Sequence, residues 1–424
     1  MKTLSLPLLL FAAVLPASAD IQWAGVNLSG AEFGQNALPG TYNSTYTYPT
    51  TAEVDYYHGK GMNFIRLPFR WERWQHTNSA ALDTTELSRA QAVIAYATKN
   101  GMTVLLDPHN FQRYYPYPRA SYETATNGLV GTTVPNTDFS NFWWRVASIY
   151  KTNPLVIFGL NNEPANMSTD QLATSENAAI AGIRAAGAGN TIFVPGNAYT
   201  GAWTWNMNYY GTANSVAMLR IVDPSNNMVF EAHQYLDSDG SGTTTNIADI
   251  QAGPTRLQPF TDWLRANHRK GFLGEFAVAN NTIGGTNLGG PTLSNMLSYV
   301  SANSDVWLGW AWWGGGPWWG SGYMFAIDPL NLGQPSQSDQ PVMGVLKHFL
   351  PLPTPMLSLV NGTKLQLVPP KGFVYRVQSR PDLAVGQWTD SGASFAGTGA
   401  STNISLPVGP GQAVFYRVKI AHAQ

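Results

Sequence analysis

Short apolar runs and helix-like stretches alternate along residues 21–350, and eight such runs can be counted. This alternation is typical of successive βα units around a parallel sheet. Eight units are the number that closes a TIM barrel, so we predict an α/β fold with a (β/α)8 domain over residues 20–350. The expected strands are 23–27, 63–67, 103–107, 156–161, 191–194, 228–232, 271–274 and 306–310.

Helices are expected between these strands wherever the apolar spacing is helical and a Gly or Asn follows. Only the crossover between residues 194 and 228 lacks a clear helix. A doubly wound open sheet is the alternative fold, but residues 25–30, after the first strand, lack the spacing of a phosphate-binding loop. The barrel is therefore favoured. The expected helices are 51–60, 86–100, 139–151, 170–186, 257–270, 292–302 and 342–350.

The alternation stops at residues 351–355, where three prolines in five residues predict a short stiff linker. Beyond it, strand-like runs at 365–368, 373–377 and 414–418 are separated by Gly, Ser and Thr turns. We predict a small all-β, sandwich-like accessory domain over residues 356–424. Its role is open: it could bind a ligand, tether the chain to a surface or support the barrel.

The first residues have the features of a secretory signal peptide. Lys2 is followed by an apolar run at 4–15 and by the small residues 17–19. This predicts a signal peptide at 1–19, cleavage near Ala19, and secretion to an extracellular or periplasmic location. The run is too short to span a bilayer, so no membrane partner is expected.

Charge and cysteine content exclude several classes of function. The net charge is −1 and charged residues make up 12% of the chain, with no basic stripe, so no nucleic-acid partner is expected. The absence of cysteine excludes disulfides, thiolate metal sites and cysteine nucleophiles. Neither a zinc-protease motif nor a serine nucleophile elbow is present. We expect a monomer that needs no cofactor and no metal.

Polar residues stand at the ends of five predicted strands, where barrel enzymes carry their active sites. Taken singly, each has a structural explanation, such as an ion pair or a helix cap. Together they indicate a functional site, because burying so many polar groups is costly. These residues are Arg66, His109, Asn110, Asn162, Glu163, His233, Tyr235 and Glu275.

Two of these residues, Glu163 and Glu275, follow the fourth and seventh strands, which lie across a barrel mouth from each other. Cleavage of a glycosidic bond needs one carboxylic acid to protonate the leaving oxygen and one carboxylate to attack or to activate water. The pair therefore predicts a glycosidase. A non-catalytic carbohydrate-binding protein is the alternative from another class.

The segment 160–164, Leu-Asn-Asn-Glu-Pro, resembles the acid/base signature of glycoside hydrolase family 5. Further matches follow in order at 64–68, 107–110, 232–237 and 274–276, so the resemblance covers residues 20–350. The stretches 233–242 and 309–320 are similar to the cellulase branch of that family.

The resemblance implies an endo-β-1,4-glucanase that acts on cellulose-type β-glucan by retaining double displacement. It makes Glu163 the acid/base and Glu275 the nucleophile. It also implies that Arg66 and Tyr235 hold Glu275 ionised and that Asn162 binds the sugar 2-hydroxyl. Mannanase, xyloglucanase or xylanase activity stays open, because loops decide substrate choice.

By the same resemblance, His109 and His233 orient neighbouring hydroxyls and carboxylates. Tryptophans at 307–319 suggest a platform for sugar rings. Strand alternation separates Trp313 from its neighbours at 310 and 312. The resemblance then implies that Trp313 is the floor of a sugar subsite, with Trp318 in the following loop as a second candidate.

Overall fold

The computed structural model describes residues 21–115, 128–247, 249–320, 322–353, 357–360, 364–370, 373–382, 386–406 and 414–422. The expected signal peptide, 1–19, and residues 354–355 of the expected linker lie outside the described residues. The chain divides into two compact units, Ile21–Leu350 and a second that contains Pro351–Gln424.

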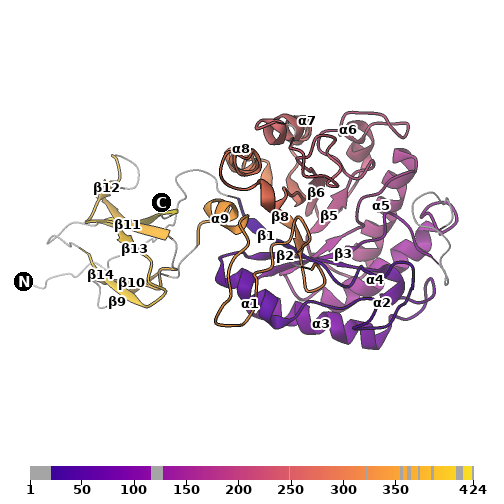
Figure 1. Ribbon diagram of the computed structural model, residues 1–424, viewed down its shortest axis with the longest axis horizontal. Helices are drawn as coiled ribbons and strands as arrows, with labels where there is room; N and C mark the ends of the chain where they lie inside the picture. The colour runs from indigo at the N-terminus through magenta and orange to yellow at the C-terminus, as the bar shows by residue number, and fades with distance from the viewer. Residues whose placement is uncertain are drawn as a thin grey trace, which may run out of the picture. The chain divides into compact units, whose positions relative to one another are not determined.

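Eight parallel strands close into a barrel in chain order, which confirms the predicted (β/α)8 fold (Figure 1). Each predicted strand overlaps an observed one. The last strand ends at residue 315, five residues beyond its predicted end at 310. The prediction ended too early because the Trp and Gly residues of this stretch resemble a loop sequence. The strands are β1 Trp23–Leu28, β2 Phe64–Phe69, β3 Thr103–Pro108, β4 Val156–Gly159, β5 Ile192–Pro195, β6 Met228–His233, β7 Gly271–Glu275 and β8 Trp307–Gly315.

The longer helices lie around the outside of the strands (Figure 1). As expected, the crossover after β5 has only short helical turns, α6 and the 3-10 turn Met218–Arg220. Within the described part of the chain, every helix is too short or too polar to cross a bilayer. The helices are α1 Thr51–Gly59, α2 Trp71–Trp74, α3 Thr84–Lys99, α4 Asn136–Tyr150, α5 Thr169–Ala185, α6 Asn214–Ala217, α7 Ala252–Ala266, α8 Gly289–Ala302 and α9 Met343–Leu346.

One apolar residue from each strand fills the barrel interior and forms a closed floor. Residues two apart on a strand point to the same side, so the next inward-facing positions lie directly above this floor. Those positions include Arg66 on β2, Asp107 on β3, Glu231 on β6 and Trp313 on β8. The sequence thus places a charged layer on an apolar one. The floor consists of Trp23, Phe64, Leu105, Ile157, Phe193, Val229, Phe272 and Ala311.

A bulge in β7 turns Glu275 toward the same interior. Glu275 stands three residues after Phe272, so regular alternation would point it outward. Ala232 pairs with Leu273 but His233 pairs with Glu275, which leaves Gly274 as an extra residue. The bulge restores the inward direction of Glu275.

The tryptophans next to Trp313 belong to the core outside the barrel wall. Trp310 and Trp312 are fully buried in the cluster that includes helix residues, and both pack edge-on against Phe276. This confirms the predicted separation of Trp313 from its neighbours.

The second unit is antiparallel throughout, which confirms the predicted all-β class. One sheet has the order β14–β10–β9, and the other has the order β12–β11–β13 with β15 paired to β11. Its apolar core is separate from that of the barrel. The strands are β9 Leu357–Val360, β10 Lys364–Leu367, β11 Phe373–Arg380, β12 Thr389–Asp390, β13 Phe395–Ala396, β14 Thr402–Ser405 and β15 Phe415–His422.

Candidate active site

Glu163 lies four residues after the end of β4, in a backbone conformation that side chains seldom adopt. Its φ is 41°, in the left-handed region. The turn is held from both sides: Asn161 Oδ1 accepts from Gln112 N at 2.7 Å, and Asn162 N donates to the Pro108 carbonyl at 3.0 Å. Such strain persists only where surrounding contacts fix it, and it is common at functional sites.

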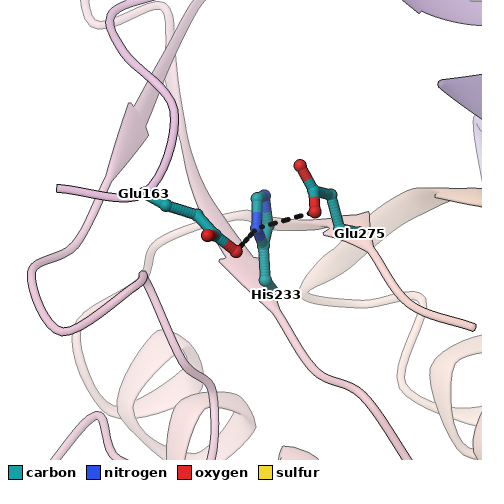
Figure 2. Close-up of side chains that lie close together, drawn as sticks. All are labelled: Glu163, His233 and Glu275. Carbon is teal, nitrogen blue, oxygen red and sulfur yellow. Dashed lines mark hydrogen bonds and ion pairs between the residues drawn. The ribbon is translucent and has the colours of Figure 1, made fainter. Parts of the chain in front are cut away.

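Glu163 and Glu275 lie on either side of the His233 imidazole (Figure 2). His233 Nδ1 is 2.7 Å from Glu163 Oε1 and 3.6 Å from Glu275 Oε2. The contacting atoms of all three side chains lie within 4.8 Å of one another. The Glu163 side chain is 16% exposed and that of Glu275 only 4%, so Glu163 has the more open position.

Arg66 is the fully buried cation at the centre of this charged layer. Its Nη1 is 2.8 Å from Glu275 Oε1, and its Nη2 donates to Asn162 Oδ1 at 2.6 Å. One guanidinium therefore connects the expected nucleophile to the residue before the expected acid. Its other partners are Asn27 at 2.9 Å, Asp107 at 3.1 Å and Glu231 at 2.8 Å.

Tyr235 is a second donor to Glu275, from Oη to Oε2 at 2.8 Å. Burial nevertheless raises the pKa of Glu275 above its ordinary value, and the nearby charge of Glu163 adds to this rise. The charges of His233 and Arg66 act in the opposite direction. The neighbours that the sequence suggested for Glu275 are thus present, but they only partly offset its burial.

For the pKa of His233, burial and the neighbouring charges balance differently. Burial lowers its pKa, but the charge of Glu275 and the hydrogen bonds to Glu163 and Glu231 outweigh burial and raise the pKa to about 10. The imidazolium form can donate through both nitrogens, from Nδ1 to Glu163 and from Nε2 to Glu231 at 3.3 Å. His233 is therefore a cation between carboxylates.

His109 is a neutral imidazole that orients Asn162. Burial lowers the pKa of His109 to about 3. Its Nδ1 lies 2.9 Å from Asp107 Oδ2 and its Nε2 lies 3.1 Å from Asn162 Nδ2. The tautomer that fits both contacts donates to Asp107 and accepts from Asn162. With Arg66 on its oxygen, the Asn162 amide is fixed at both ends.

Trp313 stacks on the His109 ring, with centroids 5.5 Å apart and planes 17° from parallel. Its Nε1 donates to Tyr323 Oη at 3.0 Å. Trp313 is only partly buried, so it can present an aromatic surface beside the carboxyl pair. Trp318, in the loop after β8, is partly exposed and packs edge-on against Phe33.

Asn110 lies beside this group, but its polar atoms are used elsewhere. Its Nδ2 donates to Glu72 at 2.8 Å and its Oδ1 accepts from Trp71 N at 2.9 Å. The structure therefore brings Asn110 to α2 and not to the two glutamates.

Sequence reasoning missed Asn27, Asp107 and Glu231, three buried polar residues that contact Arg66. All three lie within the observed strands β1, β3 and β6, one or two residues before the last residue of each strand. Spacing is the sequence signal that could have identified two of them, because Asp107 and Glu231 each follow an inward apolar residue by two positions.

Glu163, His233 and Glu275 also satisfy the distances of a three-ligand metal site. A histidine ligand must be a neutral imidazole. Because the pKa of His233 is about 10, its protonated form is favoured. The group therefore suits proton and hydrogen-bond chemistry better than metal coordination.

The comparisons with known proteins agree on one family. Residues 17–316 match the family model described as Cellulase (glycosyl hydrolase family 5). Endo-beta-1,4-glucanase B of Aspergillus niger is 40% identical over 312 residues, which is 73% of this chain and 85% of that protein.

Solved structures give the same result. An endo-beta-1,4-glucanase from Xanthomonas axonopodis pv. citri with a triple mutation has a TM-score of 0.72 and 42% identity, over 78% of this chain and 99% of that chain. XacCel5A in complex with cellopentaose has a TM-score of 0.70 and 42% identity, over the same shares of the two chains.

Proposed function

The chain belongs to the cellulases of glycosyl hydrolase family 5, and from this premise we propose the roles of its two glutamates. It is an endo-β-1,4-glucanase, a glycoside hydrolase whose substrate is cellulose-type β-glucan. The barrel supplies two carboxyl groups beside each other at the mouth, which is what hydrolysis of a glycosidic bond requires.

The separation of the two carboxyl groups supports a retaining mechanism. One oxygen of each carboxyl group lies within 4.8 Å of an oxygen of the other, which is compatible with the roughly 5–5.5 Å between the carboxyl groups of retaining enzymes. Inverting enzymes need roughly 6.5 Å or more, to hold a water between the carboxyl groups. This short separation is the single observation that carries the proposal.

In the first step, Glu275 attacks the anomeric carbon while Glu163 gives its proton to the leaving oxygen. A covalent glycosyl-enzyme forms and the leaving chain departs as an alcohol. In the second step, Glu163 takes a proton from water, which attacks the same carbon and releases Glu275. The more exposed position of Glu163 fits its exchange of protons with the leaving group and with water.

The surrounding groups support these steps. Arg66 and Tyr235 donate to Glu275 and favour its ionised form. Asn162, fixed by Arg66 and His109, is placed to bind the 2-hydroxyl of the reacting sugar. Trp313 offers an aromatic face to that sugar.

The roles are tested with Glu163→Gln and Glu275→Gln. Both should lower the release of reducing ends from a soluble β-1,4-glucan, by roughly 10²-fold to 10⁴-fold for the acid/base. Asp262→Asn removes an exposed charge and is the control. Proton NMR of early products should show the β-anomer. An α-anomer as the first product would overturn the retaining mechanism, and full activity of either variant would overturn its role.

Mannanase, xyloglucanase and xylanase remain the alternative activities on this scaffold. Initial rates on glucan, mannan, xyloglucan and xylan at equal concentration separate them. We expect glucan to be hydrolysed fastest, and a faster rate on mannan would overturn this preference.

Export and domain organisation belong to the same proposal. Lys2, the apolar run and the small residues at 17–19 support a signal peptide cleaved near Ala19 and a secreted enzyme, which we expect to be a monomer. N-terminal sequencing of the enzyme from culture medium tests this. We assign residues 20–350 as the catalytic domain, 351–355 as linker and 356–424 as the accessory β domain.

A further inference from the structure

Glu231 is a buried carboxylate that the proposed mechanism does not use. It lies on β6, two residues before His233, and only 1% of it is exposed. Its Oε1 is 3.3 Å from His233 Nε2 and 2.8 Å from Arg66 Nε. The charges of Arg66 and His233 outweigh its burial and hold the pKa of Glu231 below its ordinary value.

The neighbouring strand leaves room for this carboxylate. A Cβ at position 274 would lie 2.0 Å from Glu231 Oε1, so a side chain there would displace it. Gly274 is also the extra residue of the β7 bulge that turns Glu275 inward. One glycine therefore accommodates Glu231 and helps to aim the nucleophile.

The two partners of Glu231 depend on it to different degrees. Arg66 also contacts Glu275, Asp107, Asn27 and Asn162, so four partners would remain without Glu231. His233 Nε2, in contrast, has no other hydrogen bond or ion pair among the described residues. Loss of Glu231 should therefore free the imidazole more than the guanidinium.

We propose that Glu231 is a positioning residue that holds the His233 imidazole against Glu163 and so supports the acid/base half of the reaction. This inference rests on the proposed function. It assigns to Glu231 an effect that reaches Glu163 through His233, while the remaining partners of Arg66 hold the guanidinium against Glu275.

The proton balance follows from the contacts. When Glu163 gives its proton to the leaving oxygen, it becomes a carboxylate 2.7 Å from His233 Nδ1. Nδ1–H donates to that carboxylate, while Nε2–H donates to Glu231. No proton has to leave the imidazolium, and its charge faces Glu163, Glu231 and Glu275. Glu163 regains a proton from the attacking water in the second step.

Leaving-group dependence tests this directly, because a good leaving group needs no proton from the enzyme. The probes are 2,4-dinitrophenyl and phenyl β-cellobioside, and the measured quantity is kcat/KM, which reports the first step. For Glu231→Gln we expect a fall on the order of 10²-fold on the phenyl substrate. On the dinitrophenyl substrate we expect a fall below about fivefold, since acid catalysis contributes little there.

Three further variants serve as comparisons. Glu163→Ala should show the same selective fall in kcat/KM on the phenyl substrate, and the fall should be larger. Asp107→Asn removes a carboxylate that contacts Arg66 but not His233. It should therefore lower kcat/KM on both substrates by a similar factor. Glu231→Asp, which retracts the charge by one methylene, should show a weaker selective loss. It keeps the test available if the Gln variant does not fold.

The outcomes separate this inference from the proposed function. An equal fall on both substrates for Glu231→Gln and Glu231→Asp, or no fall, would overturn the role of Glu231 while Glu163→Ala keeps its selective loss. If Glu163→Ala shows no selectivity, the acid/base assignment itself fails. If the parent enzyme hydrolyses neither cellobioside nor soluble glucan, the proposed function fails.

Discussion

In its proposed role as the nucleophile, Glu275 must be ionised to attack, yet burial raises its pKa. The residues around it therefore have to recover the anionic form. Arg66 and Tyr235 each donate to one of its oxygens, at 2.8 Å in both cases. One pKa unit corresponds to about 1.4 kcal/mol, so a single donor can move the pH at which the enzyme works.

Tyr235→Phe tests this balance. Without the donor, the pKa of Glu275 should rise further. Because attack needs the ionised form, activity is lost as the pH falls through that pKa, so the acidic limb of kcat/KM should move to higher pH. The rate at the optimum should fall by roughly 10²-fold, as for other lost donors to a reacting group. Tyr96→Phe on α3, whose hydroxyl donates to Asp55 on α1, is the control. An unmoved limb would contradict this role.

Glu176 on α5 is a buried carboxyl of another kind. Neither of its oxygens has a hydrogen-bond partner among the described residues, and burial raises its pKa well above the ordinary value. The folded protein therefore keeps this proton at pH values where the unfolded chain has lost it. Stability contributed by the protonated form is complete below about pH 4.5 and is lost as the pH rises toward the folded pKa.

Glu176→Met should therefore stabilise the enzyme. We expect about 1–3 kcal/mol in the free energy of unfolding at pH 7, from removal of an unsatisfied buried polar group, and a smaller gain at pH 4. Urea unfolding at both pH values measures it. Glu176→Gln is the matched control, since it removes the ionisation but stays polar. A Met variant that is less stable than the parent at pH 7 would contradict the claim that this carboxyl is unsatisfied in the folded protein.

At the scale of elements, the β7 bulge joins fold and site. Gly274→Ala should place a Cβ against Glu231 and disturb the strand that carries Glu275. We expect kcat/KM on soluble glucan to fall at least about tenfold, with a lower Tm, because a buried overlap costs roughly 1–3 kcal/mol. Gly290→Ala in α8, where a Cβ would meet nothing within 4 Å, is the control and should leave activity unchanged. Equal activity of the two variants would contradict the bulge argument.

Most elements of the barrel could be predicted from apolar periodicity alone. The strands and long helices have clear spacing, and residues after strand ends meet at one mouth by topology, as Glu163 and Glu275 do. The ends of elements were harder to predict. Helix α7 begins at Ala252, five residues before its predicted start, because Pro254 disguises its first turn.

The inner charged layer could not be predicted from strand ends. Asp107 ends its apolar strand and Glu231 interrupts one, and neither position by itself indicates a contact with Arg66. The bulge at Gly274 is also invisible in sequence, since it depends on the register between β6 and β7. These features come from tertiary pairing, which a single sequence does not fix.

At the scale of the whole molecule, the barrel and the β unit are each stabilised by an apolar core and not by disulfides. The chain has no cysteine, and the barrel core and the core of the β unit share no residue. Each unit therefore has its own source of stability.

Removal of residues 354–424 should leave a folded barrel. We expect activity on soluble glucan within about twofold of the parent and a Tm shift of only a few degrees, since the barrel keeps its core. Retention on insoluble cellulose, measured by pull-down, should fall if the β unit binds polysaccharide and stay equal if it does not. Aggregation or loss of activity on soluble glucan would contradict independent folding of the barrel.

Arg66 gathers partners from β1, β3, β6 and β7 and from the turn after β4, and these partners span Asn27 to Glu275 in the chain. A folding intermediate that lacks any of these elements cannot form all of these contacts with Arg66. Catalytic turnover during refolding should therefore begin only when the strands from β1 to β7 have joined around Arg66.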